Sequence, residues 1–525
     1  MSEILSTVKD ACHQALDTVR DLSRRAPGTI TTQALCIGAA VGIVSYLLLK
    51  KRYRLPPGPF ALPLIGNLIA MSNSEEPYYI TLSRLTEKYG PVITVYLGPV
   101  PCVTLNRVDV VMEALVKKGG DFSGRPYLYS MEVMTEGFKD IIFANDSTAW
   151  KLHRKIAVQA LRHYMSGAHL EEVVQEVVTK AVEKMLAEPG AFNPHSLNMM
   201  LMFVMLDMFC FGGSKDFDEP KLVAQRDFFD KFTTDVGNGF LEDIFPPLRY
   251  FPTKKFRSFS DGLDEFLGYI YERIDEHRKH FSPSNIRDIT DSILLAQKQA
   301  EQEEGSGAMQ FFTNTHVGQT VLDLFAGGID TSRMTLDWGI YYIASFPEVQ
   351  KRMQAEIDTV TGDRLPGLAD RPRLQYTEAT LYEIMRMGTV VPMGLPHKTA
   401  VDTTIGGYEI PKDMMVLINH WALLHDPEKW DRPSEFRPER FLDAQGKLIS
   451  RPESWLPFSA GRRSCLGENV AKPELLLIFA CIVKRLQLSL APGSKYDYKP
   501  GISSFILHLP KPYEIIVTER SAGKV

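Results

Sequence analysis

The chain has 525 residues, with 59 Lys and Arg against 64 Asp and Glu, which gives a formal net charge of −5. This balance argues against a dedicated nucleic-acid-binding protein, and a mean hydropathy of −0.12 excludes a polytopic membrane protein. The six cysteines contain no CxxC pair. Neither a disulfide framework nor a cysteine-based zinc site is therefore expected, which fits a reducing compartment.

The N-terminal region predicts a membrane anchor. Residues 30–49 carry no charge and just reach the length of about 20 apolar residues that a bilayer requires. Basic residues follow at once, which places the C-terminal side in the cytosol, although arginines on the other flank oppose this. A buried core helix is the alternative. Residues 1–29 predict an amphipathic tail, and residues 50–61 a basic stop with a proline-rich hinge.

The remaining residues, 62–525, predict a single large domain that is mainly α-helical with small β-sheets. A rule of about 150 residues per domain would give three or four domains, but no repeat or second linker divides this region. Residues 311–346 contain no proline and predict one long central helix that ends before Pro347. No Walker loop or Gly-rich dinucleotide loop is visible. Strands are expected in three runs bounded by turn residues, 92–97, 102–105 and 403–411.

A glycine-rich loop near the C-terminus presents one cysteine. Residues 457–468 read PFSAGRRSCLGE. Gly461 and Gly467 would let the backbone take positive φ and approach a large flat ligand. Cys465 would stand just before a helix whose N-terminal dipole favours the thiolate, and Arg463 can meet a carboxylate. A lone cysteine is most often inert packing, so other motifs must decide its role.

The loop resembles the haem-binding motif of the cytochrome P450 family, the haem-thiolate monooxygenases. Three further motifs agree in order and spacing: the E-x-x-R of residues 383–386, the FRPERF of residues 436–441 and the GGIDTS of residues 327–332. The resemblance covers about residues 56 to 520. It implies the cytochrome P450 fold with one N-terminal transmembrane helix, haem b (iron protoporphyrin IX) as cofactor, and Cys465 as the axial ligand of the iron.

The resemblance also implies roles on the oxygen side and around the haem. Thr331 would hydrogen-bond oxygen at the iron, Asp330 would pass protons inward, and Gly328 with Gly327 would leave room above the iron. The alternative is an ordinary polar pair beside packing glycines. Phe458 in the loop would contact the haem. The propionates would be held by donors from four segments, namely Arg125, Trp150, Arg154, His397 and Arg463.

Glu383 and Arg386 lie three residues apart on one helix face, where an exposed pair would contribute little. The family pattern implies instead a buried network completed by Arg440. Electrons are expected from NADPH through NADPH–cytochrome P450 reductase, with optional help from cytochrome b5, because the chain itself shows no flavin or nicotinamide fold. Four basic residues near the motifs are candidates for the docking surface or else a solvated face: Lys151, Lys155, Arg162 and Lys472.

Within the family, the chain resembles the animal microsomal group that contains steroid 17-alpha-hydroxylase, steroid 21-hydroxylase and the aryl-hydrocarbon hydroxylases. Residues 142–154, 391–398 and 417–423 carry this resemblance. We expect a single-pass protein of the endoplasmic reticulum membrane, with its catalytic domain in the cytosol, that inserts one oxygen atom from O2 into a lipophilic substrate. A steroid is preferred, and residues 391–395 should line its pocket.

Two departures bear on that preference. Asp330 stands where 17-alpha-hydroxylases usually carry glutamate, and residues 222–240 show no match to the expected roof of the pocket. Aryl-hydrocarbon, xenobiotic or fatty-acid hydroxylation is one alternative. A haem-thiolate isomerase or dehydratase that needs no external electrons is a second, and a haem- or lipid-binding protein without turnover is a third.

Overall fold

The computed structural model describes residues 53–520, apart from 63–64, 72–75, 166–168, 238, 305–311, 498–501 and 504–506. The chain divides into two compact units, Met1–Arg54 and Leu55–Val525, and the second is described below. The predicted tail and span lie outside the described residues, as does the start of the hinge. No helix within the described part of the chain is both long and apolar enough to cross a membrane.

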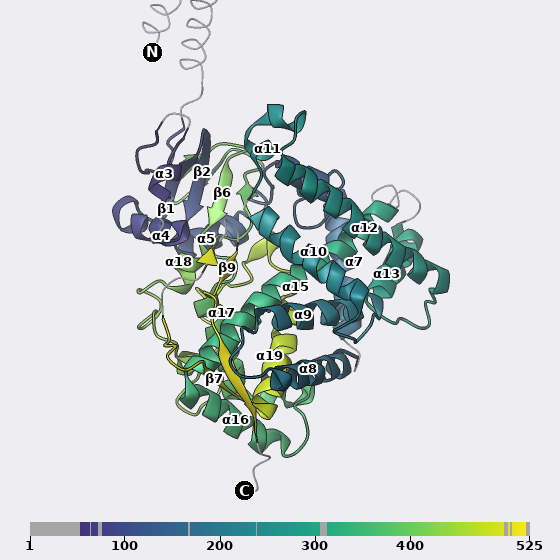
Figure 1. The fold of residues 1–525 in the computed structure, drawn as a ribbon. Helices are drawn as coiled ribbons and strands as arrows, with labels where there is room; N and C mark the ends of the chain where they lie inside the picture. The colour runs from purple at the N-terminus through teal and green to yellow at the C-terminus, as the bar shows by residue number, and fades with distance from the viewer. Residues whose placement is uncertain are drawn as a thin grey trace, which may run out of the picture. The chain divides into compact units, whose positions relative to one another are not determined.

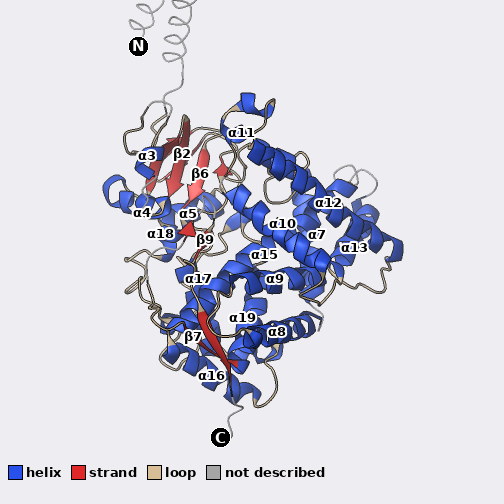
Figure 2. Ribbon diagram, in the orientation of Figure 1, coloured by secondary structure: helices blue, strands red, loops and turns tan. Residues whose placement is uncertain are grey.

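The unit Leu55–Val525 is mainly helical with small sheets, as the sequence predicts (Figures 1 and 2). The α-helices are α3 Leu68–Met71, α4 Tyr78–Tyr89, α5 Val108–Met112, α6 Tyr129–Met134, α7 Thr148–Met165, α8 His169–Ala187, α9 His195–Phe211, α10 Pro220–Gly237, α11 Leu241–Ile244, α12 Lys254–His280, α13 Ile289–Glu304, α15 Asn314–Ser345, α16 Pro347–Thr361, α17 Gln375–Gly388, α18 His420–Leu424 and α19 Glu468–Arg485. Short π- and 3-10 turns are η1 Glu113–Lys117, η2 Pro246–Arg249, η3 Leu368–Arg373, η4 Pro438–Phe441 and η5 Gly461–Arg463.

The largest described sheet has the strand order β1-β2-β6-β3. Its first two strands lie at the predicted runs 92–97 and 102–105 and form a hairpin in which Val92 pairs with Leu105, and β6 runs parallel to β2. The predicted β run at residues 403–411 is also confirmed, as the two paired strands β4 and β5. The strands are β1 Val92–Leu97, β2 Val100–Leu105, β3 His397–Lys398, β4 Thr403–Ile405, β5 Tyr408–Ile410, β6 Met415–Ile418, β7 Leu486–Leu490, β8 Ile502–Ser503, β9 His508–Leu509 and β10 Ile515–Glu519.

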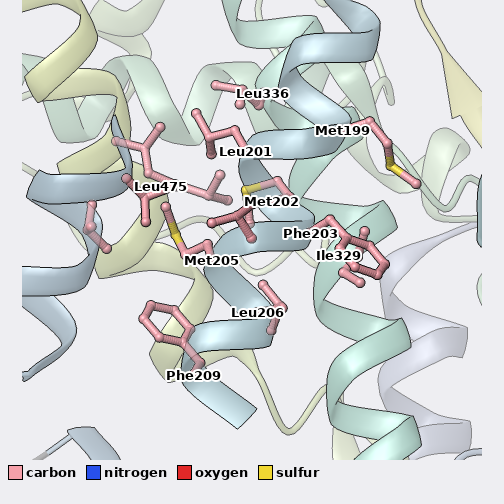
Figure 3. Close-up of a cluster of buried hydrophobic side chains, with 14 of the residues drawn as sticks. Met199, Leu201, Met202, Phe203, Met205, Leu206, Phe209, Ile329, Leu336 and Leu475 are labelled. Carbon is pink, nitrogen blue, oxygen red and sulfur yellow. The ribbon is translucent and has the colours of Figure 1, made fainter. Parts of the chain in front are cut away.

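The long helix α15 forms the centre of the core and confirms the prediction for residues 311–346. It begins after a capping box made by Thr313 and His316, and it ends where Pro347 opens α16. Residues 198–211 of the neighbouring helix α9 are all buried, and its apolar side chains are not confined to one face, as expected for a helix surrounded by protein. Figure 3 shows its methionines and leucines packed between Ile329 and Leu336 of α15 and Leu475 of α19.

A buried ion-pair network braces α17 against the segment that precedes the cysteine loop. Arg386 Nε and Nη2 donate to the two carboxylate oxygens of Glu383 at 2.7 and 2.9 Å. Arg440 Nε and the backbone N–H of Arg437 donate to the same carboxylate at 3.0 and 2.8 Å. Glu383 and Arg386 have no exposed side-chain surface. The predicted buried network with Arg440 is therefore confirmed.

Candidate functional site

Gly461 fixes the path of the cysteine loop, because a side chain at this position would clash with η1. Gly461 has φ +73°, and a Cβ at this position would lie 1.9 Å from the carbonyl oxygen of Leu115 in η1. The prediction for Gly467 is wrong in this respect, because its φ is −80° and it caps α19. The backbone N–H of Cys465 donates to the carbonyl of Phe458 at 3.0 Å, which closes the loop.

The Cys465 side chain is exposed, yet it is not in open solvent. Desolvation is the largest influence on the Cys465 thiol and raises its pKa, while the amides of Gly467 and Glu468 and the guanidinium of Arg154 oppose that rise. The amides of the helix start thus act as predicted, but burial outweighs them. A bound metal would deprotonate this thiol outright.

Three predicted propionate partners form a cluster of cations beside this loop, of which Arg125 and Arg463 are buried and Arg154 is half-buried. Burial lowers the pKa of Arg125 to about 10 and that of Arg463 to about 9, and the charge of Arg125 adds to the fall at Arg463. Arg154 adds to this repulsion, and its Nη2 donates to the Ser464 carbonyl at 2.6 Å. The carboxylate of Asp140 offsets only part of the positive charge. Three guanidinium groups held close together against their mutual repulsion suit an anion such as a pair of carboxylates.

Backbone carbonyls hold these guanidinium groups in place. Arg125 Nη1 donates to the carbonyls of Leu395 and Pro396 at 3.2 and 2.9 Å. Arg463 donates to three carbonyls, those of Ser123 (2.9 Å), Ile141 (3.3 Å) and Ala144 (2.6 Å). The cations are therefore oriented by the fold itself.

Trp150 and His397 differ from the arginines because neither of them is a cation in this structure. The indole N–H of Trp150 donates to the Ile141 carbonyl at 2.9 Å, and its ring lies 3.9 Å beneath the Arg463 guanidinium, so Trp150 serves as a platform. Burial lowers the pKa of His397 to about 3, so this ring is neutral. Its Nδ1 lies 2.8 Å from the Phe122 carbonyl and carries the proton. A carboxylate nearby would raise this pKa and let Nε2 donate as well.

One face of α15 is open at Gly327. Gly327 is exposed although α15 is largely buried, and a Cβ built on it meets no atom within 4 Å. Gly328 instead packs on α9, because its Cβ would lie 2.9 Å from Leu206 Cδ1. The open glycine is thus Gly327, and the role given to Gly328 stays a prediction. Thr331, one turn beyond Gly327, donates its hydroxyl proton to the Gly327 carbonyl at 2.7 Å.

Asp330 lies beside that face but is buried. Its carboxylate Oδ1 lies 3.1 Å from Arg333 Nη2. Desolvation raises the pKa of Asp330, and Arg333 opposes the rise. Thr331 therefore lies on the open face of α15, and Asp330 lies in the adjoining protein. This arrangement sets an acid next to a hydroxyl group.

Two carboxyl groups near the arginines are marked by no sequence motif. Asp323 lies on α15 one turn before Gly327 and accepts a hydrogen bond from the Ile141 N–H at 2.6 Å. Burial and the charge of Asp140 raise the pKa of Asp323, and burial raises the pKa of Asp140 to about 6. No sequence pattern joins these residues, because only the tertiary fold brings the loop before α7 onto α15.

The predicted basic docking surface is only partly present. Lys151, Lys155 and Arg162 are exposed on α7. Lys472 is not part of such a surface: its side chain is 8% exposed and Nζ lies 2.7 Å from the carboxylate of Glu468. The spacing of four residues on α19 brings this pair together, and their ion pair removes the lysine from solvent.

A loop-held cysteine, a cluster of arginines and an open helix face with an acid–hydroxyl pair define a haem-thiolate enzyme. Comparison with known proteins identifies the family. The sequence profile of the cytochrome P450 family matches residues 56–517. The chain is 32% identical to cytochrome P450 1A1 of Rattus norvegicus over 492 residues (91% of this chain and 93% of the relative). It is 34% identical to cytochrome P450 1A5 of Gallus gallus over 497 residues (90% and 93%) and 32% identical to cytochrome P450 1A2 of Homo sapiens over 501 residues (91% and 95%). The chain belongs to the cytochrome P450 family and is a P450 monooxygenase.

The family implies haem as the cofactor, and the residues present fit it. Cys465 offers one sulfur ligand, Gly461 lets the loop approach closely, and Arg125, Arg154 and Arg463 form a donor set suited to propionates. These observations are compatible with a large, flat group that has an iron centre and carboxylate substituents.

Proposed function

We propose that the protein is a membrane-anchored monooxygenase of the endoplasmic reticulum that hydroxylates a bulky lipophilic substrate. The observation that carries the proposal is the loop-held Cys465 sulfur beside the cluster of three guanidinium groups. The anchor rests on the apolar, uncharged run at residues 30–49. Electrons come from NADPH through NADPH–cytochrome P450 reductase, with cytochrome b5 as an optional second donor.

Each residue of the site has a distinct part in this proposal. Haem, when bound, would supply the activation of dioxygen, and Cys465 would hold its iron. Arg125, Arg154 and Arg463 anchor the propionates, while Trp150 orients Arg463 from below. His397 donates one further hydrogen bond to a propionate.

On the other side, Gly327 leaves room for the reacting atoms. Thr331 presents its hydroxyl proton on this side. The hydroxyl donates to the Gly327 carbonyl when no substrate oxygen is there to accept. Asp330 would renew that proton from the protein interior. The presence of both residues favours a monooxygenase over an isomerase or dehydratase, which would need no such proton supply.

For the substrate, the sequence motifs favour a steroid, but the comparisons do not support a steroid 17-alpha-hydroxylase-like specificity. The relatives reported above are cytochromes P450 1A, and Asp330 replaces the glutamate usual in 17-alpha-hydroxylases. Of the classes that the resemblance leaves open, we therefore propose aryl hydrocarbons and similar flat xenobiotics.

A panel of ligands measured by the spin-state shift of the haem spectrum tests this proposal. The panel contains a polycyclic aryl hydrocarbon, progesterone and a long-chain fatty acid, each titrated into the full-length protein in detergent. Tight, saturable shifts with the aryl hydrocarbon alone are expected. A tighter response to progesterone would restore the steroid assignment, and product formation without NADPH and reductase would favour the isomerase class.

A further inference from the structure

A buried chain of charges runs along α15 away from Asp330. Arg333 lies between two carboxylates: Nη2 is 3.1 Å from Asp330 Oδ1 and Nη1 is 3.0 Å from Asp337 Oδ2. The side chains of Arg333 and Asp337 are 3% and 2% exposed. Spacings of three and four residues place the three groups on one face of the helix, so that one guanidinium spans both acids.

The far end of this chain is fixed by groups from outside α15. Asn198 Nδ2 donates to Asp337 Oδ1 at 2.7 Å, and the Tyr513 hydroxyl donates to the Asp337 carbonyl at 2.6 Å. His195 Nδ1 lies 3.2 Å from Asp337 Oδ2 and 3.1 Å from Arg333 Nη1. Asp337 and Arg333 are therefore held by α9 and by the C-terminal segment.

Asp330 lies at the near end of this chain of charges, and Arg333 is the main group that favours its charged form. A carboxylate this deeply buried is costly unless a cation or donors compensate it. Desolvation raises the pKa of Asp330, and Arg333 is the largest influence that lowers it. From α10, the Thr233 hydroxyl also lowers this pKa, whereas the carboxylate of Asp230 raises it. Removal of Arg333 would therefore raise the pKa of Asp330 further.

We propose that Arg333 is the positioning residue for Asp330: it fixes the carboxylate beside Thr331 and favours its ionised form. Arg333 does not carry protons itself, because a guanidinium group stays protonated in proteins. Instead, Arg333 influences the protonation state of Asp330, the group that carries the proton. The proposal rests on the proposed function for the proton-transfer role of Asp330, whereas the pairing of the two side chains does not depend on turnover.

Infrared spectroscopy of the haem-loaded, full-length protein tests the pairing directly. Each protein is measured against its own Asp330→Asn version across a pH series, so that the difference isolates the carboxyl band of Asp330. The midpoint of protonation should rise from wild type to Arg333→Lys and further to Arg333→Gln. Lysine should be intermediate because a compact ammonium cannot span Asp330 and Asp337 together.

The control is Arg278→Gln, which removes an exposed pair with Asp275 of the same spacing, and it should leave the midpoint at the wild-type value. If Arg333→Gln fails to bind haem, the comparison of wild type with Arg333→Lys remains decisive. Equal midpoints in wild type and both Arg333 variants would overturn the pairing.

A second readout separates the pairing from its use in turnover. With reductase, NADPH and a fluorogenic alkoxyresorufin as probe, Arg333→Gln should shift the pH profile of product formation and release more hydrogen peroxide per NADPH consumed. The reduced carbon monoxide spectrum should stay that of the wild type. A shifted infrared midpoint with an unchanged pH profile would overturn the proton-transfer role of Asp330 and leave the pairing standing.

Discussion

The substitution Glu383→Gln tests whether the network that braces α17 is a buried structural element. Glutamine has nearly the same shape, so the change removes the charge and leaves the volume. The wild-type carboxylate accepts from two nitrogens of Arg386, from Arg440 Nε and from the Arg437 N–H, at 2.7 to 3.0 Å. The variant leaves two guanidinium groups without their counter-charge, one with no exposed surface and the other 5% exposed.

The cost follows from this burial. Breaking a buried ion pair by removing one partner destabilises a protein by about 3–5 kcal/mol. At about 2.1 cal/mol/K per residue, the unfolding entropy of a unit of this length is about 1 kcal/mol/K, so the melting temperature should fall by about 3–5 °C. Haem content after expression should fall as well, because the network borders the segment that leads to the cysteine loop.

Differential scanning fluorimetry at a fixed scan rate, with haem content from the pyridine haemochromogen assay, measures both effects. The matched control is Glu276→Gln, whose carboxylate is 51% exposed and lies 3.3 Å from Arg273. Exposed pairs contribute about 0–1 kcal/mol, so this control should melt within about 1 °C of wild type. Equal melting temperatures for the two variants would refute the structural role of the network.

Three further predictions concern the glycines and one buried ion pair. Gly461→Ala should lower haem content several-fold, because its Cβ would lie 1.9 Å from a backbone carbonyl of η1, and haem absorbance checks this. Gly327→Ala should keep the wild-type melting temperature but weaken binding of the largest spin-shift ligands, whereas Gly328→Ala should lower the melting temperature, because its Cβ would crowd α9. Burial lowers the pKa of His277, but its bond to Asp288 outweighs burial and the net shift is upward. This pair therefore stabilises the fold fully below the unfolded pKa of about 6.5, and the contribution is lost as pH rises through the folded value. His277→Gln should accordingly lower the urea midpoint more at pH 6 than at pH 9, and an equal loss at both would refute this sign.

Local patterns predict the elements of the fold well because each depends on nearby residues. The absence of proline from 311–346 and the following Pro347 give the limits of α15 to within a few residues. The same local reasoning fails where two local influences compete. Lys472 was expected on a docking surface, but its ion pair with Glu468 buries it. Gly467 was expected at positive φ, whereas it serves as a helix cap at φ −80°.

The site is predictable only as far as its motifs reach. Cys465 and the arginines follow from the family pattern, but the stacking of Arg463 on Trp150 requires the fold. No sequence motif links Asp323 and Asp140, because the electrostatic interaction between their carboxyl groups arises from tertiary contact. Arg333 and Asp337 could have been found, since their spacing from Asp330 is that of helical ion pairs. Substrate preference lies in the shape of the enclosed space, which no motif encodes.

The measurement that tests the central claim most directly is the reduced carbon monoxide difference spectrum of the full-length protein and of Cys465→Ala. A thiolate ligand to the iron shifts the Soret band of this complex strongly to the red. We predict that wild type shows the red-shifted band and that Cys465→Ala lacks it while keeping the fold of the wild type by circular dichroism. A wild-type protein without this band, or a Cys465→Ala protein that retains it, would contradict the assignment of Cys465 as the axial ligand.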